Sequence, residues 1–267
     1  FLRQLSQDVE ADWPGVLAKL EAVRQHLLNR SQMICNVTLD DENWAQFQPQ
    51  LHDFISTMPA NKVILADWAV ALASSSEGLT IPAQVNYVGK GANLYDLGYK
   101  LHGSNAVIRK FLGTTYLWEK IRVQGGAYGG FCTFDRDSGV FTYLSYRDPN
   151  LEKTLANYDG TAAFLRNLEL HEDELTKSII GTIGSFDAYQ LPDAKGFTAL
   201  SRHLIGLTDE ARQQYRDEVL STTVADFQAF GEVLAQMKED GVVVVLGSAD
   251  AINAANEDDW MEVSRVM

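Results

Sequence analysis

The sequence contains only two cysteines in 267 residues, and it has no apolar run of the length that crosses a membrane. A transmembrane helix needs about 20 consecutive apolar residues, and the N-terminal residues also lack the pattern of a secretory signal. Cys35 and Cys132 lie in stretches of alternating apolar residues. We therefore expect both to be small core residues in a reducing compartment, rather than parts of a disulfide framework or a zinc knuckle.

Basic side chains are also few. The sequence has 22 lysines and arginines against 36 aspartates and glutamates, which gives a formal net charge of −14. An acidic surface opposes binding to nucleic acids and to anionic membranes, and it attracts basic partners. The alternative is that the acidic side chains only keep the protein in solution. The apolar fraction of 46% indicates a globular chain, and its length suffices for one or two domains.

The common zinc-binding motifs are missing as well. Five histidines occur, but none lies in an H-E-x-x-H or H-x-x-E-H motif. The nearest match, H-E-D-E-L at residues 171–175, lacks the second histidine. Its three acidic residues suit the first turn of a helix, where the backbone favours negative charge. The sequence therefore predicts a solvated helix start at this position and no metal bound by this chain.

Hydrophobic periodicity and turn residues divide the chain into helices and strands. Helices are expected at residues 16–30, 42–57, 104–120, 150–168, 171–189, 195–206, 208–220, 223–238 and 249–267. Strands are expected at residues 32–39, 81–91, 131–134, 140–147 and 242–247, with the third and fourth forming a hairpin and the last central and buried. This order predicts an α+β fold, a two-layer sandwich in which helices cover one face of a mainly antiparallel sheet.

The candidate site lies in residues 118–147, where two glycine pairs bracket Tyr128 and a predicted helix ends near Arg122. A phosphate-binding loop is excluded, because it needs a preceding strand and a lysine within the loop. An arginine can bind a carbonyl or carboxylate group, and a tyrosine hydroxyl can donate to an oxygen that gains negative charge. The alternative is that Tyr128 is a packed aromatic residue and that Arg122 only favours the C-terminal end of its helix.

The string L-W-E-K-I-R-V-Q-G-G-A-Y-G-G at residues 117–130 resembles the presequence protease branch of the insulinase-type, or pitrilysin-type, zinc metallopeptidases, in its C-terminal half. The resemblance continues through the hairpin, the helical run and the V-V-V-V-L-G strand at residues 242–247, so it covers most of the chain. Its most specific element is the arginine and the tyrosine in their glycine setting.

Enzymes of this family are clams of two similar halves, each made of two homologous α+β domains, around a large chamber. The resemblance implies that zinc is bound by the N-terminal half, that this chain binds none, and that the chain supplies Arg122 and Tyr128. Tyr128 would stabilise the tetrahedral intermediate as zinc-bound water attacks the scissile amide. Arg122, Gly125 and Gly126 would bind the peptide substrate beside it.

By the same resemblance, residues 1–60 would be the C-terminal part of the third domain, residues 61–77 a linker, and residues 78–267 the fourth domain. A Ser/Gly-rich patch at residues 74–78 marks the boundary. Because H-x-x-E-H is absent, we predict that the chain alone is inactive. It would degrade unstructured peptides, basic ones among them, only together with the N-terminal zinc-binding half.

Two other functions stay open. A catalytically inactive homologue could serve as a peptide-binding or processing-complex partner subunit, and loss of the arginine and the tyrosine would mark it. A stand-alone binding module would be supported if no inverted zinc motif were encoded upstream. The resemblance also leads us to expect a protein of the bacterial cytoplasm or of an organellar matrix, with no nucleic-acid or membrane partner.

Overall fold

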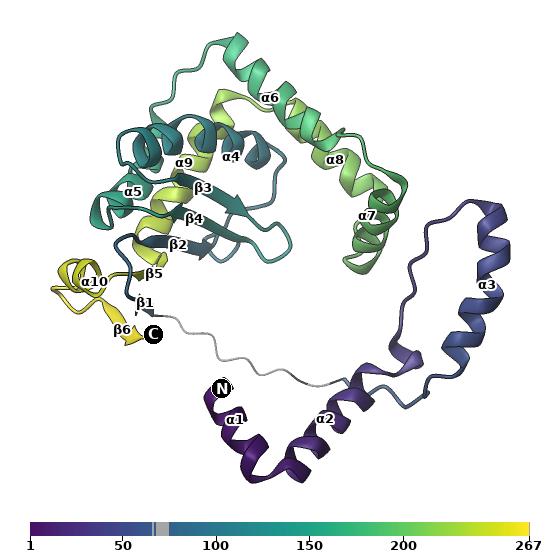
Figure 1. The fold of residues 1–267 in the computed structure, drawn as a ribbon. Coiled ribbons are helices and arrows are strands. Elements are labelled where there is room, and N and C mark those ends of the chain that lie inside the picture. Colours follow the sequence, from purple (N-terminus) through teal and green to yellow (C-terminus); the bar gives the residue numbers. More distant parts are fainter. Residues whose placement is uncertain (66, 68–74, 267) are drawn as a thin grey trace. The chain divides into compact units, whose positions relative to one another are not determined.

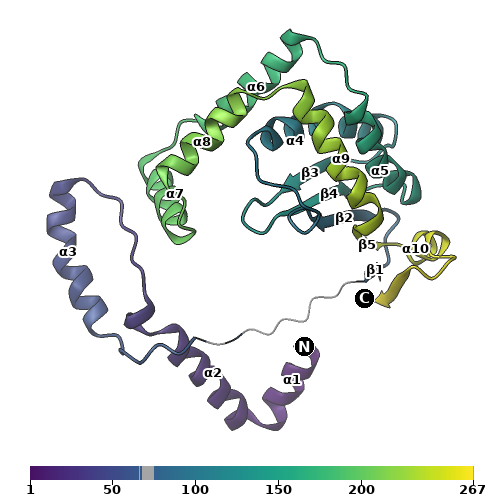
Figure 2. The ribbon, with the colours of Figure 1, turned by 180° about the vertical axis from the view of Figure 1, so that it is seen from behind.

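The computed structural model describes residues 1–65, 67 and 75–266, and the chain divides into two compact units (Figures 1 and 2). The helical unit consists of Phe1–Ala71 and Gln190–Gly206, and the sheet unit consists of Leu72–Tyr189 and Leu207–Met267. The predicted linker at residues 61–77 includes residues 66 and 68–74, which lie outside the described residues. Residues 190–206, within the range expected for the fourth domain, belong to the helical unit.

The sheet unit is built on a six-stranded sheet in the order β3-β4-β2-β5-β1-β6. Its strands are β1 (Ser76–Thr80), β2 (Tyr87–Asn93), β3 (Gly129–Phe134), β4 (Val140–Tyr146), β5 (Val242–Gly247) and β6 (Met261–Arg265). Strand β2 is antiparallel to β4 and β5, and β3 is antiparallel to β4, whereas β1 is parallel to β5 and β6. Most pairings are therefore antiparallel, which confirms the predicted fold class, and β5 is central as predicted.

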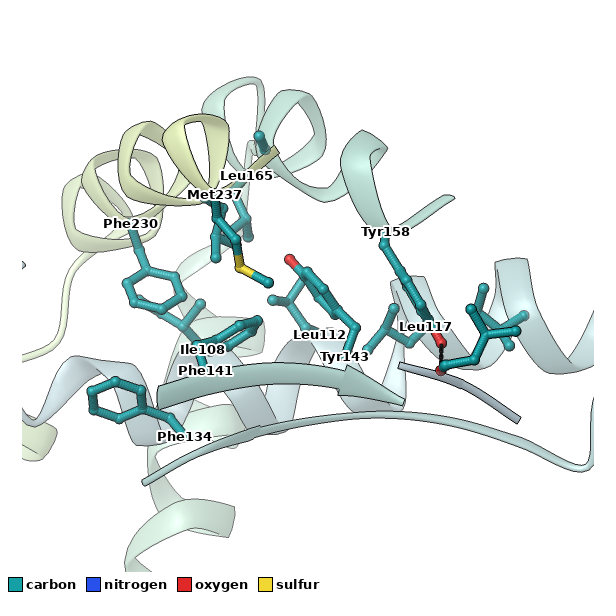
Figure 3. Packing of buried hydrophobic residues seen from close by; sticks show 14 of the residues in the cluster. Ile108, Leu112, Leu117, Phe134, Phe141, Tyr143, Tyr158, Leu165, Phe230 and Met237 are labelled. Carbon is teal, nitrogen blue, oxygen red and sulfur yellow. Dashed lines mark hydrogen bonds between the residues drawn. The ribbon is translucent and has the colours of Figure 1, made fainter. Parts of the chain in front are cut away.

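Helices cover one face of this sheet. The helices and helical turn of the sheet unit are α4 (Ser104–Thr114), the π-helical turn η2 (Trp118–Val123), α5 (Glu152–Arg166), α6 (Glu172–Phe186), α8 (Asp209–Leu220), α9 (Val224–Asp240) and α10 (Ala249–Ala255). Helices α6 and α8 pack against α4 and against each other. Helices α5 and α9 pack along each other and contact β2, whereas α4 and η2 contact β3. Figure 3 shows side chains of α4, α5 and α9 meeting those of β4 on the same side of the sheet.

The alternation of side chains along β4 explains the core. Phe141 and Tyr143 are buried, whereas their neighbour Leu144 is 41% exposed on the opposite face. The ring of Tyr143 stacks on Tyr158 of α5, and the hydroxyl of Tyr158 donates to the backbone oxygen of Val88 over 3.2 Å (Figure 3). Complete burial of a large apolar side chain stabilises a fold by about 1.5–3 kcal/mol, so this cluster holds the helices on the sheet.

The helical unit contains α1 (Leu2–Ala11), α2 (Trp13–Leu27), the short 3-10 turn η1 (Arg30–Gln32), α3 (Asp41–Ser56) and α7 (Pro192–Leu204). The predicted helices at residues 16–30 and 42–57 are thus confirmed. Asp40 caps α3, because its carboxylate accepts the backbone N–H of Asn43 over 2.9 Å. This backbone hydrogen bond, together with a second bond from the Asn43 side chain, lowers the pKa of Asp40.

The apolar face of α2 is largely uncovered, and two predictions for the residues after this helix are wrong. On α2, Val16 is buried, but Leu20, Val23 and Leu27 are 54%, 53% and 72% exposed, because no strand of the described helical unit covers them. The strand expected at residues 32–39 does not form, since residues 33–39 are neither helix nor strand. A strand needs a partner for its backbone groups, and without one Cys35 is exposed rather than a core residue.

The sheet unit corrects three element boundaries. Strand β2 begins at Tyr87 rather than at Ile81, and β1 forms from the Ser/Gly-rich patch in which we expected a boundary. Its two parallel neighbours, β5 and β6, overcome the weak strand propensity of Ser76 and Gly78. The final segment is α10 followed by β6 rather than one closing helix. Strand β5 is buried on one face only, since Val244 is 42% exposed.

Two other sequence predictions, the helix start after His171 and the packing of Cys132, are confirmed. Helix α6 begins at Glu172, directly after His171, with exposed acidic residues in its first turn. Cys132 packs against the core of the sheet unit. Burial raises the pKa of its thiol to about 12, so the thiol stays protonated at neutral pH. Among the residues that the structure describes, no helix has the length and hydropathy of a membrane span.

Candidate active site

Arg122 lies on a helical segment that changes its winding. The predicted helix at residues 104–120 is interrupted at Thr115 and continues as the wider η2 turn, which ends at Val123. The hydroxyls of Thr114 and Thr115 donate to the carbonyls of Lys110 and Phe111 over 2.9 and 2.6 Å. Such bonds compete with the helix and bend it, which is the local reason that one regular helix does not form.

Two glycines close this helical segment and turn the chain toward β3. Gly126 has φ +80°, a conformation that is usual for glycine at the end of a helix. Its N–H donates to the carbonyl of Arg122 over 2.9 Å, and the N–H of Ala127 donates to that of Ile121 over 3.1 Å. A Cβ on Gly125 would lie 2.4 Å from the Ile121 oxygen. Both glycines therefore have a backbone role, and their predicted contact with substrate stays a prediction.

The guanidinium of Arg122 stacks on its own helix. Its central carbon lies 4.3 Å from the ring centroid of Trp118, four residues earlier, and both side chains are exposed. Stacking uses the face of the guanidinium and leaves the N–H groups at its edge available to a carbonyl or carboxylate. Arg122 also lies in the last turn of η2. Its positive charge therefore also interacts favourably with the C-terminal end of the helix, in addition to any binding role.

Tyr128 is not a packed aromatic residue. Its side chain is 67% exposed, although its backbone N–H donates to the carbonyl of Tyr146 over 3.0 Å. The ring meets that of Tyr146 edge to face, with centroids 6.3 Å apart, and Tyr146 meets Tyr87 in the same way at 5.5 Å. An anchored backbone with an exposed hydroxyl suits a donor that acts on a bound molecule, and the packed alternative is wrong.

A short turn after β4 holds the Tyr128 loop from the other side. The side-chain amide of Asn150 donates to the backbone oxygen of Gly125 over 2.6 Å. Asp148 is fully buried and accepts hydrogen bonds from the hydroxyl of Thr154 at 2.7 Å and from the N–H of Asn150 at 2.9 Å. Because α5 carries Thr154, the loop is tied to the packed core, which restricts the positions that Tyr128 can take.

The predicted site residues lie on one continuous segment, but the side chains of Arg122 and Tyr128 each contact other residues and not each other. Arg122 stacks on Trp118, whereas Tyr128 contacts Tyr146 and lies beneath the guanidinium of Arg147, whose central carbon is 5.3 Å from its ring centroid. Trp118 and Arg147 were not identified from the sequence. The spacing of four between Trp118 and Arg122 on a helix was the available signal, and Arg147 gave none.

The side chains that the structure describes do not form a zinc site. A zinc site needs three or four convergent cysteine, histidine or carboxylate ligands. No group of three such side chains is close enough to hold a metal ion within residues 1–65, 67 and 75–266. The guanidinium groups of Arg122 and Arg147 and the hydroxyl of Tyr128 instead offer hydrogen-bond donors, which can bind carbonyl or carboxylate oxygens.

Sequence comparison identifies relatives. The profile of the PreP C-terminal domain family matches residues 76–249. The chain is 47% identical over 270 residues to presequence protease 1, chloroplastic/mitochondrial, of Arabidopsis thaliana, and the alignment covers 100% of this chain and 25% of that protein. The chain spans about a quarter of the length of the curated relatives it matches.

Solved structures share the fold. An inactive M16 peptidase domain from Pseudomonas fluorescens matches with a TM-score of 0.52 and 15% identity, over 79% of this chain and 52% of that one. Pitrilysin matches with a TM-score of 0.52 and 11% identity, over 84% of this chain and 25% of that one. At these identities the likeness concerns the fold alone.

Proposed function

Because the chain belongs to the PreP C-terminal domain family, we propose that it is the C-terminal, zinc-free portion of a zinc-dependent metalloendopeptidase. The complete enzyme degrades unstructured peptides inside a clam-like chamber, and this chain supplies Arg122 and Tyr128 to the active site. The observation that carries the proposal is the exposed hydroxyl of Tyr128 on a backbone that two segments anchor.

The two side chains act on different oxygens of the peptide. The hydroxyl of Tyr128 donates a hydrogen bond to the scissile carbonyl oxygen as that oxygen gains negative charge, so it stabilises the transition state more than the bound substrate. Arg122 donates the N–H groups at its edge to a neighbouring backbone carbonyl and holds the peptide in position. Gly125 and Gly126 present open backbone beside it.

The partner of this chain is the N-terminal, zinc-binding half of the same protein. The described residues lack a ligand set for zinc, so the metal ligands belong to that half, and this chain alone does not hydrolyse peptides. The formal charge of −14 supports unstructured basic peptides as substrates, because an acidic chamber wall attracts them. The compartment is a bacterial cytoplasm or an organellar matrix.

The domain division of the complete enzyme follows from the same proposal. Residues 1–60 are the end of the third homologous domain, residues 61–77 are a linker, and residues 78–267 are the fourth domain with the arginine and the tyrosine. The exposed leucines and valine of α2 support this division. An apolar helix stripe is stable in water when other elements cover it, and the remainder of the third domain would do so.

Replacing Tyr128 with phenylalanine in the full-length peptidase tests the proposal. Loss of one oxyanion donor lowers kcat by about 10²–10³-fold, and we expect KM to change much less. The matched control is Tyr189→Phe, which removes a hydroxyl from a side chain that is 83% exposed outside the site. Steady-state kinetics on an unstructured peptide gives both constants. An unchanged kcat for Tyr128→Phe would remove Tyr128 from the chemistry.

The second candidate function is a catalytically inactive partner subunit that binds peptides. The shared fold with an inactive M16 domain is compatible with it. Such a subunit has no need for an exposed tyrosine and arginine in the motif positions, and this chain keeps both, which favours the peptidase. Peptide binding without any effect of Tyr128→Phe on turnover would favour the subunit.

A further inference from the structure

Arg147 has an unusual backbone conformation. Its φ is +50°, in the left-handed region where a Cβ crowds the following carbonyl at a cost that glycine avoids and asparagine tolerates better. The position therefore carries arginine although a smaller residue would fit the backbone more easily. Residues held in such conformations cluster at functional sites, so a functional role of the Arg147 guanidinium would account for arginine at this position.

The residues on both sides keep Arg147 in place. Tyr146 accepts the N–H of Tyr128 over 3.0 Å, and Asp148 exchanges two backbone hydrogen bonds of 2.8 Å with Asn86. The buried carboxylate of Asp148 is held by Thr154. With both neighbours tied to the sheet and the core, the backbone of Arg147 cannot relax without breaking these bonds. From this fixed backbone position its guanidinium reaches over Tyr128, with the central carbon 5.3 Å from the ring centroid.

Arg147 also lacks, among the described residues, the carboxylate partner that three other arginines of the sheet unit have. Arg166, Arg212 and Arg216 each form an ion pair with a carboxylate at 2.5–2.7 Å. In the part of the chain that the structure describes, Arg122 and Arg147 have no such carboxylate and stack on aromatic rings, as Arg136 does on Tyr215. Arg122 and Arg147 differ from Arg136 in lying on the segments that meet at Tyr128, where their exposed guanidinium groups are available to a bound peptide.

We propose that Arg147 is a second substrate-binding residue, and that it binds a carboxylate of the peptide close to the scissile bond. The carboxylate is that of an acidic side chain or of the peptide's C-terminus, both of which match the planar fork of a guanidinium. Arg122 binds a backbone carbonyl, which every peptide has, whereas Arg147 selects among peptides. This inference rests on the proposed peptidase function of Arg122 and Tyr128.

The test uses the full-length peptidase and three matched peptides. The first is neutral near its mapped cleavage bond and has an amidated C-terminus, the second has glutamate in place of one glutamine flanking that bond, and the third has a free C-terminal carboxylate. Arg147→Asn removes the guanidinium and keeps a residue that tolerates the backbone conformation. Arg147→Lys keeps the charge without the fork. Lys177→Gln, an exposed site on α6, is the control for net charge.

We expect the parent enzyme to cleave one carboxylate-bearing peptide with a kcat/KM about fivefold above that of the neutral peptide, the upper range for an exposed ion pair. Which peptide gains identifies the source of the carboxylate. Arg147→Asn should reduce this ratio to about one, Arg147→Lys should keep part of it, and Lys177→Gln should leave it unchanged. High salt should reduce the ratio for the parent enzyme.

Three results would overturn the inference. They are a parent enzyme without preference, a ratio that Arg147→Asn leaves unchanged, and an equal loss on all three peptides, which would show that Arg147 only positions Tyr128. Tyr128→Phe, assayed in parallel, separates the two proposals. If Tyr128→Phe lowers kcat as predicted while Arg147→Asn leaves the ratio of kcat/KM between the peptides unchanged, only the proposed carboxylate site fails. If Tyr128→Phe is fully active, the proposed function itself fails.

Discussion

At the scale of single residues, the exposed aromatic side chains near β3 act as supports for polar groups. The guanidinium of Arg122 stacks on the ring of Trp118, and that of Arg147 lies over the ring of Tyr128. A cation that stacks on a ring loses part of its rotamer freedom before substrate arrives, which lowers the entropic cost of binding. The sequence identified Arg122 and Tyr128 by their motif, but it could not show which ring each cation uses.

Replacing Trp118 with leucine should weaken substrate binding through Arg122. A cation–π contact at an exposed site is worth about 0.5–1 kcal/mol, so we expect KM to rise by about two- to fivefold with little change in kcat. Trp118→Phe keeps a ring and should recover part of the loss. Steady-state kinetics of the full-length peptidase measures both constants.

A double-mutant cycle decides whether Trp118 acts through Arg122. If it does, Trp118→Leu has no further effect in an Arg122→Ala background, because the stacked cation is already gone. Losses that simply add in the double variant would mean that Trp118 contributes independently, for example by contacting the peptide itself.

At the scale of elements, the π-helical turn η2 decides where the site residues lie. If the α-helix continued without a break as far as Arg122, this side chain would point in a different direction, because α- and π-helices differ in the number of residues per turn. π-Helical turns are rare and are frequently found at functional sites. The hydroxyls of Thr114 and Thr115 disturb the regular helix, and Gly126 ends the segment in the left-handed conformation.

Replacing Gly126 with alanine should destabilise the sheet unit by about 1–2 kcal/mol, because a Cβ at φ +80° is strained. The control is Gly184→Ala on α6, where an added Cβ meets no atom within 4 Å. That change should stabilise the chain by about 0.5–1 kcal/mol, since alanine favours a helix more than glycine does. Urea unfolding followed by near-UV circular dichroism gives both shifts. Shifts of the same sign would contradict the assigned role of Gly126.

At the scale of the molecule, the chain combines a sheet unit that buries a core with a helical unit whose apolar side chains are largely exposed. Leu27 of α2 and Phe54 of α3 are 72% and 59% exposed. Exposed apolar surface of this extent indicates an interface with another domain or protein rather than a solvent-facing surface. We therefore expect the remainder of the third domain to cover these side chains, and the N-terminal half of the enzyme to supply the zinc site.

Mixing the purified 267-residue chain with the separately produced remainder of the enzyme, which holds the zinc-binding half and the rest of the third domain, should restore zinc-dependent peptidase activity, whereas neither piece alone should hydrolyse a peptide. The reason is that the transition-state donors and the metal ligands would lie on different pieces. A chain that carries Tyr128→Phe serves as the control and should restore little activity. Zinc-dependent hydrolysis by the isolated chain, with contaminating peptidases excluded, would contradict this arrangement.

The sequence by itself determined the fold class, most helices, the β3–β4 hairpin and the identity of Arg122 and Tyr128 as site candidates. These follow from local information, because periodicity, turn residues and a short motif lie within a few residues of one another. The central position of β5 was likewise evident from its continuous apolar run.

Only the tertiary structure decided features that depend on distant partners. Strand β1 forms because β5 and β6 pair with it across more than 160 residues of chain. Residues 32–39 form no strand, because no strand within the described residues pairs with them. The exposure of Tyr128 and the guanidinium of Arg147 above its ring likewise follow from contacts between separate segments. Pairing and burial are properties of such contacts, so no local pattern in the sequence could contain them.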